Sequence, residues 1–105
     1  MLIDKFFAEF LGTLIFLAVI ITTVDSHCIY DNTQAWIRIP IALMVSILAF
    51  GYISGGHFNP AVSFMFFMDN RLTFEELMAY MFAQILGGLL AYFYYVYTKK
   101  YLNKK

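Results

Sequence analysis

The chain has 105 residues, of which 62% are hydrophobic, 20% are aromatic and only 13% are charged. A water-soluble domain of this length rarely has such a composition, so a soluble protein is effectively excluded. Seven basic residues balance seven acidic ones, which removes the positive field that nucleic-acid binding requires. The single cysteine, Cys28, can form neither an internal disulfide nor a cysteine-based zinc site.

Three long apolar stretches follow one another along the chain, at residues 6–24, 36–53 and 77–97. A helix needs about 17 to 25 residues to cross about 30 Å of hydrocarbon. Glu9 stands where the basic leader of a signal peptide would meet its apolar core, and no small-residue cleavage pattern follows, so the first stretch is expected to be a retained helix. The sequence therefore predicts an all-α transmembrane fold, multi-pass in the lipid membrane, in one unit over residues 1–105.

The segment 54–68 lies between the second and third stretches and is too short to cross the membrane. At 1.5 Å per residue, its helical part from Pro60 onward reaches only about 13 Å. Asn59 is a natural N-cap, Pro60 is suited to the first helical position, and the glycine pair Gly55-Gly56 disfavours regular helix before it. These residues predict a re-entrant loop and a half-helix whose unpaired N–H groups face a solute path.

A resemblance to a known family rests on three segments: AEFLGT at 8–13, SGGHFNPAVS at 54–63 and AQILGG at 83–88. In this order they resemble the N-terminal half, or first repeat, of an aquaporin, a member of the major intrinsic protein family. The resemblance covers essentially the whole chain. It implies a channel component for passive transport of water and small neutral solutes such as glycerol, with no metal or other cofactor. Catalysis is not expected, since the apolar stretches lack converging titratable groups.

The resemblance also assigns residues to the solute path. Asn59 is expected to donate a hydrogen bond to the passing solute, and the loop carbonyls are expected to line the path. Ile39 falls at the position that the second helix contributes to the selectivity constriction, where an isoleucine indicates a less polar filter. The expected path residues are Asn59, Pro60, Ala61, Gly55, Gly56, His57 and Ile39.

Two further polar residues, Glu9 and Gln84, match buried positions that tie the loop and half-helix to the surrounding helices in the family. Each has a simpler alternative. Glu9 is close enough to the N-terminus to be an interfacial side chain, although an acid inside a membrane span is usually functional. Gln84 could be an ordinary interhelical hydrogen-bonding residue.

Aquaporins contain two inverted repeats, and this sequence matches one of them. A homo-oligomer with copies in opposite orientations, or a complementary aquaporin half, is therefore expected to complete the pore. The alternative is a non-conducting, truncated aquaporin-like protein or a modulator of a full-length channel. Val62 stands where the second repeat normally has an arginine, which predicts weaker selection against glycerol. The family's cytoplasmic N-terminus and the positive-inside rule disagree here, so both orientations stay open.

Overall fold

The protein, described here by a computed structural model, is defined over residues 1–25 and 35–102; Cys28 lies outside these residues. The described residues form helices joined by loops and contain no strand, which confirms the predicted all-α class. The helices, in chain order, are α1 Leu2–Thr23, α2 Ala35–Ser54, α3 Pro60–Met68 and α4 Phe74–Leu102.

Three of these helices, α1, α2 and α4, are long and apolar enough to cross a membrane. The helix α4 is longer than the stretch 77–97 because hydropathy marks only the part suited to hydrocarbon. Its N-terminus is set by a capping box, in which the Thr73 hydroxyl accepts from the Glu76 N–H at 3.1 Å and the Glu76 carboxylate accepts from the Thr73 N–H at 3.0 Å. With 29 residues, α4 is about 43 Å long.

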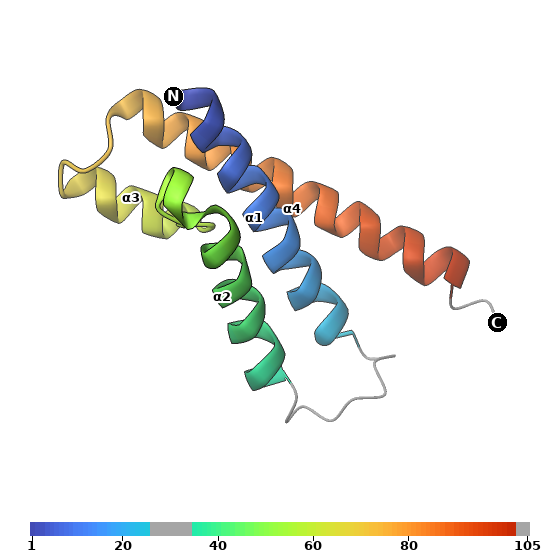
Figure 1. Cartoon of the computed structure of the whole chain (residues 1–105). Coiled ribbons are helices and arrows are strands. Elements are labelled where there is room, and N and C mark those ends of the chain that lie inside the picture. The colour runs from blue at the N-terminus through green and yellow to red at the C-terminus, as the bar shows by residue number, and fades with distance from the viewer. Residues whose placement is uncertain (26–34, 103–105) are drawn as a thin grey trace.

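The helix α1 contacts both α2 and α4, while α3 packs against α4 (Figure 1). Small and hydroxyl residues make these contacts close. A Cβ atom on Gly87 would stand 2.8 Å from the Phe10 carbonyl oxygen, so the glycine lets α4 approach the α1 backbone. Between α1 and α2, the Ser46 hydroxyl donates to the Gly12 carbonyl at 3.2 Å.

The last turns of α4 diverge from α1 in Figure 1. This part of the helix carries a series of exposed aromatic side chains and has Lys99 and Lys100 in its last turn. Amphipathic rings and snorkelling lysines are typical of helix segments at a membrane interface. The exposed aromatic residues are Tyr92, Phe93, Tyr94, Tyr97 and Tyr101.

Candidate functional site: the loop 55–59 and the N-terminus of α3

The backbone of the loop between α2 and α3 turns sharply at three residues with positive φ. Gly55 and Gly56 have φ of 94° and 69°, which glycine adopts at little cost, whereas Phe58 has φ of 52°. Such a conformation costs a non-glycine residue on the order of 1–2 kcal/mol. The Phe58 ring is buried against Gly12 of α1, where any Cβ would overlap it. The glycine of the 8–13 segment therefore makes room for the loop.

The Glu9 side chain is the centre of the hydrogen bonding that supports this loop. It is fully buried. One carboxylate oxygen accepts from the Ser54 hydroxyl at 2.6 Å and from the His57 N–H at 3.0 Å. The other accepts from the Phe58 N–H at 2.7 Å and from the Gln84 amide at 2.9 Å. All four partners donate, which matches the acceptor capacity of an ionised carboxylate, so one side chain of α1 joins the loop to both α2 and α4.

Gln84 extends this network from α4 to α3. Its amide nitrogen also donates to the Ser63 hydroxyl oxygen at 2.8 Å. That hydroxyl lies 2.9 Å from His57 Nδ1. The His57 ring stacks on Phe66, with 4.7 Å between centroids, and lies 5.0 Å from the Tyr80 ring. The imidazole is therefore held by a hydrogen bond from α3 and by rings of α3 and α4.

Asn59 caps α3 through its side chain. Its backbone is extended, and its Oδ1 atom accepts from the Ala61 N–H at 2.8 Å. Pro60 occupies the first turn, where the missing N–H costs no helical hydrogen bond. Because the oxygen forms the cap, the NH2 group points its donors elsewhere. Asn59 and Ala61 are exposed, so the N-terminal end of the helix lies on an open face of the chain.

The other expected path residues are divided between two places. Gly55 is exposed, and Gly56 and His57 are half-buried, all within the same short loop. Ile39 is half-buried near the beginning of α2. It lies about 22 Å along the helix axis from Ser54, where α2 ends, so it is not part of the group around Glu9.

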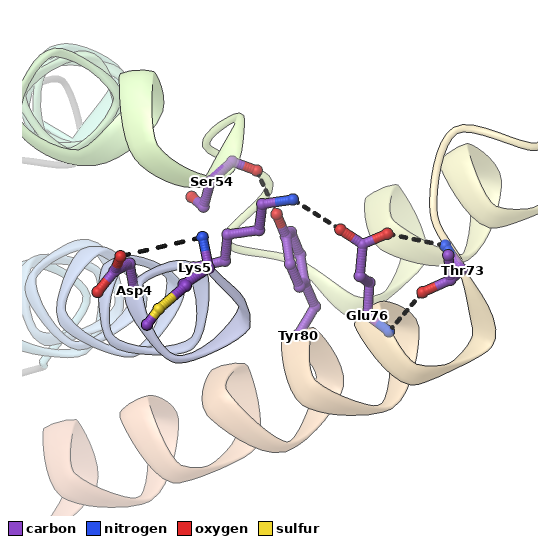
Figure 2. A network of polar contacts seen from close by, with 7 residues as sticks. Asp4, Lys5, Ser54, Thr73, Glu76 and Tyr80 are labelled. Carbon is purple, nitrogen blue, oxygen red and sulfur yellow. Dashed lines mark hydrogen bonds and ion pairs between the residues drawn. The ribbon is translucent and has the colours of Figure 1, made fainter.

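A second polar group lies next to the end of α2, where the N-terminal turns of α1 and α4 meet (Figure 2). Lys5 Nζ reaches across to the Glu76 carboxylate at 2.7 Å. The Tyr80 hydroxyl donates to the Ser54 carbonyl at 2.5 Å and so satisfies one of the unpaired carbonyls at the end of α2. A cavity of about 380 Å³ lies between these groups, and its lining includes Gly55 and His57.

Sequence reasoning did not single out the partners that complete this site. Ser54, Ser63 and Tyr80 are all buried. Ser54 bonds to Glu9, Ser63 to Gln84, and Tyr80 to the Ser54 carbonyl at the end of α2. A usable signal was present for the serines, since a hydroxyl in an apolar segment needs a partner. The ion pair of Lys5 with Glu76, separated by 71 positions, had no local signal.

Comparison with known proteins places this arrangement in a family. The family model of the major intrinsic proteins matches residues 1–104. The glycerol uptake facilitator protein-like 6 of Lactiplantibacillus plantarum is 38% identical over 83% of the chain and 40% of its own length. Nodulin-26 of Glycine max is 38% identical over 85% of the chain and 34% of its own length. The aquaglyceroporin AqpS of Rhizobium meliloti is 37% identical over 78% of the chain and 38% of its own length.

The chain spans only about a third to two fifths of the length of these curated relatives. No solved structure matches it. The match to the family and the three long apolar helices make it a multi-pass integral membrane protein. The chain belongs to the major intrinsic protein family, whose members are membrane channels and not enzymes.

Proposed function

We propose that this repeat forms one half of a channel for the passive transport of water and small neutral solutes such as glycerol. The observation that carries the proposal is the N-terminus of α3. Asn59 uses its oxygen to cap the helix at 2.8 Å from the Ala61 nitrogen, which leaves its NH2 group to donate to a passing oxygen atom. The positive end of the helix dipole adds to this and disfavours cations.

We assign the rest of the path to the loop carbonyls and to Ile39. The carbonyls of Gly55, Gly56 and His57 would accept hydrogen bonds from a solute that Asn59 binds as a donor. Ile39 would narrow the path farther along α2 with an apolar surface. The names of two relatives, a glycerol uptake facilitator and an aquaglyceroporin, support a small polyol as a solute besides water.

A complete pore requires a second wall opposite Asn59. A second copy in the opposite membrane orientation would supply it and bring two Asn59 side chains together, as would a complementary aquaporin half. The exposed position of Asn59 and Ala61 at the end of α3 supports such an assembly. The alternative function is a non-conducting protein that modulates a full-length channel.

The proposal is tested by the osmotic shrinkage of liposomes that contain the purified protein, followed by light scattering beside empty vesicles. We expect shrinkage several-fold faster than that of empty vesicles, and a return to their rate in Asn59→Asp. Aspartate caps a helix as well as asparagine does, so the variant keeps the fold but replaces the amide donor with a negative charge. Asn70→Asp is the matched control, because Asn70 is exposed after the other end of α3.

The assembly is tested separately with two differently tagged copies of the chain. If the chain pairs with itself, each tag retains the other, and reporters on the termini reveal both orientations. If folded protein alone is as slow as empty vesicles, but changes the rate of a co-reconstituted six-span relative, the alternative function replaces the proposal.

A further inference from the structure

The buried network contains a chain of hydrogen bonds whose direction is determined at its first member. The carboxylate of Glu9 can only accept, so the Gln84 atom that lies 2.9 Å from it is the amide nitrogen. The same nitrogen lies 2.8 Å from Ser63 Oγ and donates its second hydrogen there. The opposite amide orientation would place the Gln84 oxygen against the carboxylate.

The other end of the Gln84 side chain is left unpaired in this orientation. Its carbonyl oxygen is buried and has no hydrogen-bond partner within the described part of the chain. An unpaired buried acceptor is destabilising. The fold keeps the two bonds donated by the amide nitrogen although the amide oxygen is left without a partner. The two donors are directed to Glu9 and Ser63.

The direction continues through Ser63 to the imidazole. Ser63 is fully buried, and its hydroxyl oxygen has two hydrogen-bond partners, Gln84 and His57. A hydroxyl oxygen can accept two hydrogen bonds, but if His57 also donated to Ser63, the buried hydroxyl hydrogen would have no acceptor among the described residues. An unpaired buried donor is destabilising, so the hydroxyl hydrogen is directed to His57 Nδ1, 2.9 Å away. In a neutral imidazole one nitrogen accepts and the other carries the hydrogen. His57 therefore carries its hydrogen on Nε2.

The Nε2 atom lies beside Gly55. A Cβ on Gly55 would stand 3.4 Å from it, and both residues line the cavity of about 380 Å³ beside Lys5, Glu76 and Tyr80. This volume accommodates a solute of a few heavy atoms. Lys5 and Glu76 at the same cavity are paired with each other at 2.7 Å, and the Tyr80 hydroxyl is used by the Ser54 carbonyl. Arg71 also lines this cavity, and its Nε donates to Asp69 at 2.7 Å. The Nε2–H of the His57 ring has no hydrogen-bond partner among the described residues, so it is an available neutral donor at this cavity.

We propose that Glu9, Gln84 and Ser63 fix His57 as an Nε2–H donor that binds a hydroxyl oxygen of a small neutral polyol in this cavity. The inference rests on the proposed transport function for its purpose, but the hydrogen-bond chain and the binding can be measured without transport. His57 is the solute-binding group, and Ser63 and Gln84 are positioning residues.

The tautomer is measured by ¹⁵N NMR of protein labelled at histidine, in alkaline buffer where imidazole is neutral. The chain has two histidines, and His27→Asn assigns the signals. We expect wild-type His57 to be protonated at Nε2, with Nδ1 shifted by its hydrogen bond. In Ser63→Ala the Nδ1 resonance should move to the position of an unbonded acceptor, and an Nδ1–H population should appear. Ser63→Thr, which keeps the hydroxyl, should retain the wild-type signals.

Binding is measured by adding glycerol to the same sample. The Nε2–H resonance of wild-type His57 should shift in a saturable way, while that of His27 serves as the internal reference. In the transport assay, Ser63→Ala should reduce the ratio of glycerol to water permeability by about 2- to 10-fold, the range of one neutral hydrogen bond. A general packing defect would reduce both permeabilities alike.

Wild-type His57 protonated at Nδ1 would overturn the inference without the need for any variant. The same conclusion follows if Ser63→Ala leaves the His57 signals unchanged, or if glycerol shifts both histidines equally. If no sample conducts but the tautomer and the saturable shift are found, the proposed transport function fails and the directed donor stands.

Discussion

The loop 55–59 and the last turns of α4 satisfy their backbone hydrogen-bonding groups in opposite ways. In α4 the helix satisfies its own N–H and C=O groups, and side chains such as Tyr94 are 55% exposed. The loop has three residues with positive φ and cannot pair its backbone internally. The N–H groups of His57 and Phe58 are instead bound by Glu9 of α1. Specific polar residues are therefore required where the backbone is irregular, whereas general apolar and aromatic character suffices elsewhere.

The largest effect is expected from removing the acceptor at the centre of the loop. Glu9→Ala removes the acceptor of four hydrogen bonds, three of them buried, including those from the N–H groups of His57 and Phe58. Each unpaired buried group costs about 1–3 kcal/mol, with incomplete additivity, so the free energy of unfolding should fall by roughly 3–5 kcal/mol. Denaturant titration in detergent micelles measures this change.

The matched control for this substitution is Glu75→Ala. Glu75 is an exposed carboxylate in the first turn of α4, and its removal should change the free energy of unfolding by about 0.5 kcal/mol or less. Equal losses for the two variants would contradict the view that the loop depends on directed acceptors.

A smaller effect on the free energy of unfolding is expected when a tyrosine hydroxyl is removed beside the loop, and a smaller one still when it is removed in the last turns of α4. Tyr80→Phe removes the donor that satisfies the Ser54 carbonyl at the end of α2, and Tyr80 is 1% exposed. The free energy of unfolding should fall by about 1–2 kcal/mol. Tyr94→Phe, at an exposed position of α4, should leave it within about 0.5 kcal/mol. A loss in Tyr94→Phe as large as that in Tyr80→Phe would remove the distinction between the regions.

Sequence reasoning identified the elements whose signals are local. Apolar length alone predicts the three long helices, and Asn59 followed by Pro60 predicts where α3 begins, because capping and a fixed φ act within a few residues. The helix α4 extends beyond the predicted 77–97 since Thr73 and Glu76 form a cap outside the apolar stretch.

Less of the candidate site could be predicted from the sequence. Glu9 and Gln84 were found through the family resemblance. An acid and an amide are also conspicuous in apolar spans, even when the groups that they bind are unknown. Which groups they bind depends on the packing of separate helices, as in the bond from Gln84 to Ser63. No pattern along the chain gives the direction of that bond or the tautomer of His57, because both follow from three-dimensional contacts.

The smallest expected effect concerns the ion pair between Lys5 and Glu76, which joins the first turns of α1 and α4. The atoms are 2.7 Å apart, but the side chains are 36% and 21% exposed, and such pairs contribute about 0.2–1 kcal/mol. Glu76→Gln is the suitable variant because glutamine preserves the capping box with Thr73 and removes only the charge. Combined with Lys5→Met in a double-mutant cycle, it should give a coupling energy of about 0.5 kcal/mol that decreases as salt is added. A coupling above about 2 kcal/mol that is insensitive to salt would show that this pair behaves like the buried contacts of Glu9, and that the directed polar network extends to the N-terminal end of the helices.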